Sequence, residues 1–184
     1  MSAKGGTQVV MLRGINLGGR RRVPMETLRA LLGEAGFGDV RTYLQSGNAV
    51  LTSRLAGDEL EQRCNRLISE HFGFDVPVVA RTAKDLRRVV AVNPLAGVAA
   101  EPKRYQVSFL AQPLPPERLA SLERLAAGSE RLVAVGRELY AWHPDGVARS
   151  KLGNALAASG LGVKATARNW STVLALLELA DAWV

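Results

Sequence analysis

The sequence from residue 8 to residue 24 reads QVVMLRGINLGGRRRVP. Its first five residues, Gln8–Leu12, predict a strand. The ten residues 13–22 contain three glycines, four arginines and no acidic residue. Pro24 then predicts the first turn of a helix, because proline has the backbone angle of a helix start and needs no amide partner there. A strand, a basic glycine loop and a helix therefore follow one another at the start of the chain.

The composition of this loop is typical of an anion-binding site. Glycines let backbone amides approach a ligand closely, arginines carry fixed positive charge, and a helix N-terminus favours anions. The loop lacks the Gly-Lys-Ser/Thr ending of a Walker A motif and the Gly-x-Gly-x-x-Gly spacing of a dinucleotide-binding fold. These absences argue against a P-loop ATPase and a nicotinamide enzyme.

The rest of the first half alternates strand and helix signals. A helix from Pro24 presents an apolar face and ends at Gly36. The remaining predicted elements are a hairpin of strands 40–44 and 49–53 around Gln45-Ser46-Gly47-Asn48, a helix over about 58–72, a strand over 76–81 and a further helix with Thr82 and Asp85 as its capping pair.

The second half repeats this plan. The predicted elements are a strand over 105–111, a helix from Pro115-Pro116, a hairpin of strands 131–135 and 138–142 around Gly136-Arg137, a helix over 150–159, a strand over 163–168 and a helix over 170–183. We therefore predict an α+β fold of two ferredoxin-like (βαββαβ) halves, each followed by an extra helix. The repeated element order, with the matching stretches 79–82 and 166–169, favours an internal duplication.

The predicted domains are a first ferredoxin-like half over 1–93, a linker over 94–103 and a second half over 104–184. In the βαββαβ plan the first two strands run parallel, so the loop after the first strand and the turn of the hairpin meet at one end of the sheet. Arg81 and Thr82 fall at the opposite end. The candidate ligand-binding residues are therefore Arg13, Gly14, Asn16, Gly18, Gly19, Arg20, Gln45, Ser46 and Asn48.

Several of these residues also have a purely structural interpretation. Arg13 can pair with Glu26 or Asp39 inside the protein instead of binding an anion. Gln45, Ser46 and Asn48 are turn residues by default, and Arg20 belongs to a run that solvent alone can accommodate. Asn169 is expected to cap the last helix and Trp170 to anchor it to the core. Arg168, like Arg13, has both a functional and a structural interpretation.

Charge and composition limit the classes of function. The net charge is +7, which attracts phosphates and nucleic acid. Cys64 is the only cysteine, so no internal disulfide is expected, and we expect it to be a core residue. His71 and His143 are the two histidines, which argues against a transition-metal site. No metal or cofactor is predicted.

No apolar run is long enough to span a membrane, and the N-terminal residues lack the apolar centre of a signal peptide. We therefore expect a cytoplasmic protein without a membrane partner. Homo-oligomerisation stays open. Catalytic residues are unassigned, because Ser46 has no histidine near it in sequence and His143, expected to be exposed in a loop, would have to approach from the second half.

Nucleic-acid binding is the main alternative to small-anion binding, because ferredoxin-like sheets can stack bases on aromatic side chains. Tyr105 and Phe109 alternate on one strand and Tyr140 and Trp142 on another. The residues opposite them suggest that the first pair is in the core and the second pair is on the open face, where it would pack between halves or subunits.

Four segments together resemble the bacterial family of uncharacterised proteins catalogued as domain of unknown function 1697. These segments are Val10–Gly19, Val23–Met25, Val40–Asn48 and Ala165–Trp170. Leu17 and Leu44 stand where family members often have valine and isoleucine. The resemblance implies a two-part α+β fold with a duplicated ferredoxin-like plan and no established activity. It also implies that the arginine-glycine loop, the Gln-Ser-Gly-Asn turn and the Ala-Arg-Asn-Trp segment are the hallmarks of the family.

The leading hypothesis is that the protein binds a small phosphorylated, carboxylated or nucleotide-like ligand at the loop after the first strand. Arg13 and Arg20 would neutralise the anion, and the polar turn would give selectivity. The alternatives are a nucleic-acid-binding protein, which would use the basic loop and the open sheet face, and a protein-interaction module without a ligand. Whether the protein is an enzyme is left open.

Overall fold

The computed structural model describes residues 5–157 and 159–182. The first sheet and its helices are built by the N-terminal half of the chain. In chain order these elements are β1 (Gly6–Leu12), α1 (Met25–Glu34), β2 (Gly38–Tyr43), β3 (Asn48–Ser53), α2 (Gly57–Phe72), β4 (Val78–Thr82) and α3 (Ala83–Val92).

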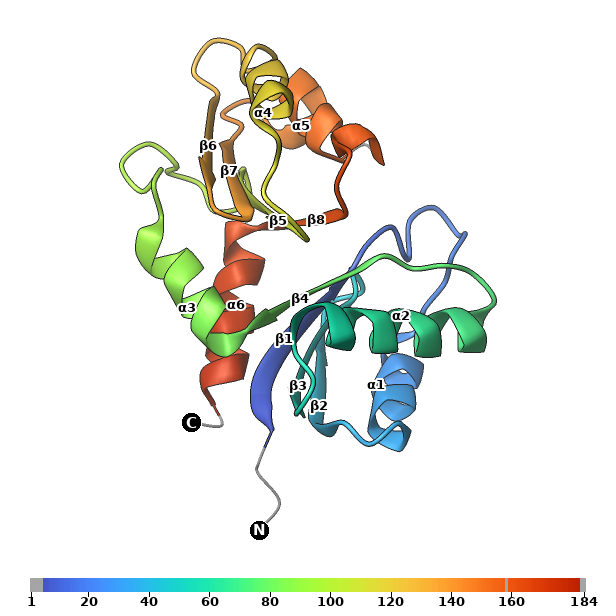
Figure 1. Ribbon diagram of the computed structural model, residues 1–184. Coiled ribbons are helices and arrows are strands. Elements are labelled where there is room, and N and C mark those ends of the chain that lie inside the picture. The colour runs from blue at the N-terminus through green and yellow to red at the C-terminus, as the bar shows by residue number, and fades with distance from the viewer. Residues whose placement is uncertain (1–4, 158, 183–184) are drawn as a thin grey trace. The chain divides into compact units, whose positions relative to one another are not determined.

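The first sheet has the strand order β2-β3-β1-β4, and every neighbouring pair is antiparallel. Because β3 lies between them, β1 and β2 run parallel. Helices α1 and α2 lie together on one face of this sheet (Figure 1). Apolar residues from both helices and from the sheet form the core between them, among them Leu28, Cys64 and Val10.

The second sheet is built in the same way. Its elements are β5 (Tyr105–Leu110), α4 (Pro116–Glu123), β6 (Arg131–Val135), β7 (Glu138–Trp142), η1 (Val147–Arg149), α5 (Lys151–Ala157), η2 (Ser159–Leu161), β8 (Ala165–Asn169) and α6 (Trp170–Asp181). The strand order β6-β7-β5-β8 matches that of the first sheet position by position. The predicted α+β fold of two ferredoxin-like halves is therefore confirmed, as is the repeated strand order.

Contacts divide the chain into two compact units. One contains the chain up to Arg87 together with the segment from Ala175, and the other contains Arg88–Leu174. These divisions fall within α3 and α6, whereas the sequence predicts boundaries at residues 94–103. That stretch contains turns and lies within the second unit. The predicted halves over 1–93 and 104–184, joined by a linker over 94–103, stay a prediction.

The two sheets end their last strands with the same local chemistry. Arg81 and Arg168 are both buried, and each donates a hydrogen bond from Nη1 to the carbonyl of the preceding alanine, at 2.9 and 2.8 Å. Thr82 and Asp85 form the predicted capping box, with Thr82 N–H donating to Asp85 Oδ2 and Asp85 N–H donating to Thr82 Oγ1. The two sheets therefore share this arginine contact as well as the strand order.

Tyr105 and Phe109 are buried, as predicted, but the expectation that Tyr140 and Trp142 lie on an open face is wrong. Tyr105 pairs with Trp142 across the sheet, and Phe109 pairs with Glu138, so all four aromatic residues lie on the same face. Tyr140 donates to the carbonyl of Val89 on α3, and the ring of Tyr105 stacks on that of Trp170 at the start of α6. All four side chains are buried, so this face is covered and not open.

Two smaller expectations also change. The helix predicted over 150–159 ends earlier, at Ala157, and a single 3-10 turn, η2, follows after residue 158, which lies outside the described residues. The last helix is described as far as Asp181, so the predicted end at Trp183 lies outside the described residues. Trp170 anchors that helix, as expected from the sequence.

Candidate functional site

The loop after β1 and the turn of the β2–β3 hairpin lie side by side, as the strand order predicts. Leu12 N–H donates to the carbonyl of Gly47 at 2.8 Å, and Asn16 Nδ2 donates to the carbonyl of Gln45 at 2.7 Å. We call residues 13–23 and 44–48 together the loop–hairpin edge. Arg81 and Thr82 lie at the other end of the sheet, because Thr82 pairs with Gln8 and Val78 pairs with Leu12.

The side chain of Asn16 holds this edge together. Besides its bond to Gln45, its Nδ2 donates to the carbonyl of Val23 at 2.9 Å, and its Oδ1 accepts from the Val23 amide at 2.9 Å. The backbone of Asn16 also takes a positive φ of 56°. The carboxamide therefore closes the basic loop on itself and fastens it to the hairpin, so its role in this structure is positioning.

The tip of the basic loop is a two-residue turn. Leu17 and Arg20 form an antiparallel bridge, and the central glycines Gly18 and Gly19 have φ values of 62° and 82°. Positive φ at both central positions is the requirement of a type I′ turn, which explains both glycines without a ligand. Apart from the adjoining residues of the chain, no described atom lies within 4 Å of the place where a Cβ would stand at either position, so the turn faces open space.

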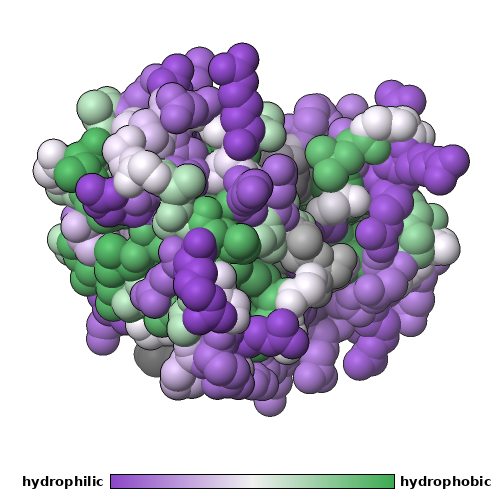
Figure 2. All heavy atoms as spheres, turned by 90° about the horizontal axis from the view of Figure 1, so that it is seen from above, coloured by the Kyte–Doolittle hydropathy of each residue, from purple (hydrophilic) through white to green (hydrophobic). Residues whose placement is uncertain are grey.

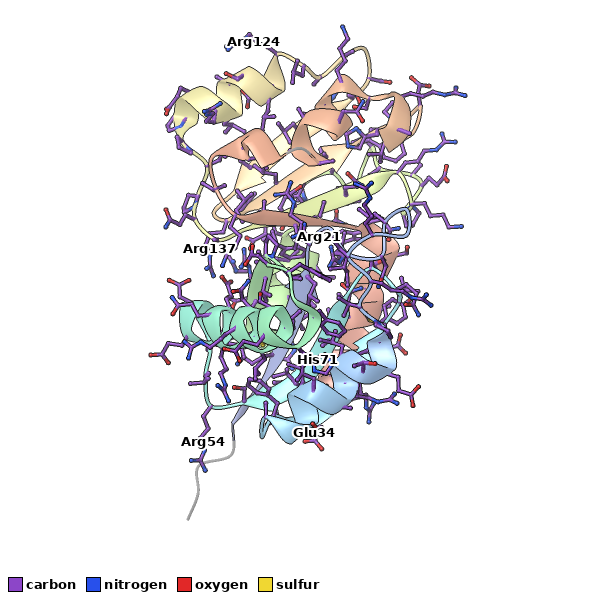
Figure 3. All side chains as sticks on the ribbon, turned by 90° about the vertical axis from the view of Figure 1, so that its right-hand side faces the viewer. Arg21, Glu34, Arg54, His71, Arg124 and Arg137 are labelled. Atoms are coloured by element: carbon purple, nitrogen blue, oxygen red, sulfur yellow. The ribbon has the colours of Figure 1, made fainter. Side chains whose placement is uncertain are left out.

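The four arginines of the loop have different surroundings. Arg21 donates to the carbonyl of Asp75, and its guanidinium lies 5.5 Å from the ring centre of Phe74. Arg13 is half-buried, and its amide donates to the carbonyl of Pro77. Arg20 and Arg22 are exposed. In Figure 3, Arg21 lies at the end of the first unit opposite the end that carries Arg54 and Glu34.

The predicted polar residues of the hairpin turn fall into two groups. Gln45 and Ser46 are exposed. Asn48 is fully buried, and its Nδ2 donates to the carbonyl of Tyr43 at 2.8 Å and to Ser46 Oγ at 3.0 Å. Gly47 is closely packed, because a Cβ there would lie 2.7 Å from Ile15 Cδ1. Gly14, with a φ of 68°, is half-buried beside Arg21.

Unfavourable backbone angles collect at this edge. The described chain has five non-glycine residues with positive φ, and three of them, Asn16, Arg21 and Leu44, belong to the loop–hairpin edge. Leu44, with a φ of 57°, is also 52% exposed, and Leu17 is 72% exposed. Such backbone strain costs about 1 kcal/mol or more per residue and gathers at ligand and switch sites.

A polar cluster in the second unit was not predicted. His143 is completely buried, contrary to the expectation of an exposed loop histidine, and its Nδ1 lies 3.0 Å from Glu130 Oε1 and 3.1 Å from Ser150 Oγ. Ser150 Oγ also accepts from the Gly153 amide at the start of α5. Both contacts involve the same ring nitrogen, so the geometry differs from a serine–histidine–carboxylate relay, in which the two partners bind opposite nitrogens.

The described part of the chain supports neither a metal site, nor a reactive thiol, nor a membrane-spanning helix. No group of three or more histidine, cysteine or carboxylate side chains there is placed to hold a metal ion. Burial raises the pKa of Cys64 to about 12, so its thiol is protonated and unreactive at neutral pH. Among the helices of the described residues, none combines the length and the apolar character that crossing a bilayer requires.

Sequence comparison places the chain in a family. The model of a family described as "Protein of unknown function (DUF1697)" matches residues 6–140, which include the whole loop–hairpin edge. The chain belongs to the DUF1697 family. No curated protein matches it.

A solved structure among those that match has the same fold as this DUF1697 protein. It is described as "The structure of conserved bacterial protein SP0830 from Streptococcus pneumoniae", and the two chains are 22% identical. The alignment has a TM-score of 0.76 and covers 95% of this chain and 98% of the other. At this level of identity, the likeness shows that the two proteins share a fold.

Proposed function

We propose that this protein binds a small anionic ligand, phosphorylated or nucleotide-like, at the loop–hairpin edge. The observation that carries the proposal is the concentration of strained backbone there. Asn16, Arg21 and Leu44 all adopt a conformation that side chains disfavour, within two short segments joined by the Asn16 carboxamide. A surface loop that served only to connect β1 to α1 would not need this arrangement.

Charge supports an anion as the ligand. Arg20 and Arg22 are exposed. Arg21, which lies between them in the chain, contacts Asp75 and Phe74 and so fixes this part of the loop. The Gly18–Gly19 turn, which faces open space, directly precedes Arg20 in the chain. Gln45 and Ser46 supply neutral polar groups across the edge, which suits selection among phosphorylated ligands. Arg13 stays a candidate, whereas the amide groups of Asn16 and Asn48 act by positioning.

The two alternatives have weaker support. Nucleic-acid binding through stacked bases needs exposed aromatic side chains, and Tyr105, Phe109, Tyr140 and Trp142 are buried. An interaction module would need a continuous contact surface. On the face shown in Figure 2, hydrophobic areas are interrupted by protruding hydrophilic side chains.

Calorimetric titration of the full chain with inorganic phosphate, sugar phosphates and nucleotides tests the proposal. We expect Arg20→Gln and Arg22→Gln each to weaken binding about tenfold, the usual effect of losing one charge-assisted contact. Arg29→Gln is the matched control, because Arg29 is exposed on α1 of the same unit, outside the edge. Equal losses in all three variants would indicate non-specific charge attraction and contradict the proposal. Binding to any nucleic acid with a steep salt dependence would favour the nucleic-acid alternative.

A further inference from the structure

A recess lies at the opposite end of the first sheet from the loop–hairpin edge. It is formed by the connection between α1 and β2, the end of β3 and the second turn of α2, and it has a volume of about 550 Å³. The seven residues of β1 separate it from the basic loop, a distance of roughly 20 Å at the rise of an extended strand. The two features therefore occupy separate places on one unit.

The recess combines an apolar wall with cations. Phe37 and Leu55 line it and pack against the core of the first unit, so they present fixed apolar surface. Arg54 and Arg63 line it as well, and the described residues of the lining include no carboxylate. Glu34, the last residue of α1, lies at the same end of the unit without lining the recess (Figure 3).

Most other polar groups of the recess already have partners. Thr52 Oγ1 donates to Asp39 Oδ2 at 3.2 Å, and Ser53 Oγ accepts from the Leu55 amide at 2.9 Å. Arg63 is half-buried, and within the described chain it makes no hydrogen bond or ion pair. A half-buried guanidinium beside apolar surface is a group that an anionic ligand can satisfy.

We propose that this recess binds a small amphipathic anion, with an aromatic or short aliphatic body against Phe37 and Leu55 and a carboxylate or phosphate at Arg63 and Arg54. The volume lies within the range of small-molecule sites, and the mixture of apolar wall and a few charged groups is typical of them. Inorganic phosphate alone would leave the apolar wall in contact with water, so the apolar body is expected to contribute to binding.

Titration of the full chain with four probes tests this assignment: phenyl phosphate, benzoate, inorganic phosphate and benzyl alcohol. We expect phenyl phosphate or benzoate to bind at least tenfold more tightly at the recess than inorganic phosphate or benzyl alcohol. Whichever of the first two binds more tightly identifies the anionic group. Equal binding of all four probes, or binding of none, would overturn the proposal.

Variants then locate the bound probe. Arg63→Gln and Arg54→Gln should each lower the affinity for this probe about tenfold. Ala35→Leu should lower the affinity as well, by filling the recess that Ala35 lines. Arg66→Gln is the control, because Arg66 is exposed on the same helix and outside the recess. Thermal unfolding of each variant checks that it folds. Unchanged affinity in the folded Arg63→Gln and Ala35→Leu variants, or an equal loss in Arg66→Gln, would contradict the assignment.

The two sites are separated by crossing the variants. Arg20→Gln should leave phenyl phosphate or benzoate binding at the recess unchanged, and Arg63→Gln should leave phosphate binding at the loop–hairpin edge unchanged. If Arg20→Gln abolishes binding of the amphipathic probe, that probe binds at the edge and the recess proposal fails. If Arg63→Gln weakens the binding of every probe and Arg20→Gln weakens the binding of none, the recess proposal stands and the edge proposal fails.

Discussion

Asn16 and Gln45 are 29 positions apart in the sequence and are joined by a hydrogen bond of 2.7 Å from the Asn16 carboxamide to the Gln45 carbonyl. This bond, with the two that Asn16 makes to Val23, holds the basic loop against the hairpin turn. The candidate site therefore depends on a residue whose side chain is occupied within the protein.

Asn16→Ala should destabilise the protein by about 2–4 kcal/mol, because it removes three hydrogen bonds and leaves alanine with a positive φ. Asn16→Asp keeps the acceptor for the Val23 amide, so its free energy of unfolding should lie between those of the parent protein and of Asn16→Ala. Urea denaturation measures the free energy of unfolding, with Asn154→Ala on the exposed face of α5 as control. An effect of Asn16→Ala no larger than that of the control would show that the carboxamide does not hold the edge.

Gly47→Ala should destabilise the protein more than Gly73→Ala, although the two glycines have similar backbone angles. Gly47 and Gly73 have φ values of 83° and 77°. A Cβ at Gly47 would lie 2.7–2.8 Å from Ile15 and Leu12, whereas one at Gly73 would have no described atom outside the adjoining residues within 4 Å. We expect Gly47→Ala to cost about 1–3 kcal/mol more than Gly73→Ala in chemical denaturation. Similar costs would mean that backbone angle alone explains both positions.

Asn169→Ala should cost on the order of 1 kcal/mol in stability and leave ligand binding intact. Asn169 Oδ1 accepts from the Thr172 amide at 2.9 Å, which caps α6 as the sequence predicts. Asn169→Asp retains the acceptor and should restore the stability. If Asn169→Ala left the free energy of unfolding unchanged and abolished phosphate binding, the assignment of Asn169 as a cap would be wrong.

Glu130 should make the stability of the protein depend on acid pH. Burial favours a higher pKa for this carboxyl, but hydrogen bonds from Ser150, the Ala127 amide and His143 outweigh it and hold the pKa below the ordinary glutamate value. A carboxyl whose pKa is lower in the folded protein stabilises it at neutral pH, and this contribution is lost as the pH falls through the folded-state pKa.

We therefore expect Glu130→Gln to lose about 1–2 kcal/mol of stability at pH 7 and to approach the parent protein as the pH falls below the ordinary glutamate range. Urea denaturation across this range measures the difference, and Glu123→Gln on the exposed surface of α4 serves as control. A constant difference between Glu130→Gln and the parent at every pH would show that the carboxylate charge is not responsible.

Most of the fold follows from local signals in the sequence. Helix α1 starts next to Pro24, and the hairpin strands 131–135 and 138–142 have the predicted bounds, because proline, the Gly-Arg turn and apolar periodicity act within a few residues. The meeting of the basic loop with the hairpin turn also follows, since it depends only on the strand order.

The errors arise where contacts join distant elements. Both faces of the second sheet are covered, one by α4 and α5 and the other by residues of α3 and α6, so polar alternation along β5 and β7 does not reveal which face is open. The partners of His143 come from before β6 and before α5, and no local pattern joins them. Likewise, the sequence of the basic loop does not indicate that the Asn16 side chain forms hydrogen bonds with Val23 and Gln45.

The central claim is tested most directly by following backbone amide resonances of the full chain while inorganic phosphate or a nucleotide is added. Binding at the loop–hairpin edge predicts saturable shifts of the amides of Gly18, Gly19, Gln45 and Ser46, lost in Arg20→Gln and retained in Arg29→Gln. Saturable shifts confined to residues outside this edge, or no saturable shift with any of these ligands, would contradict the account.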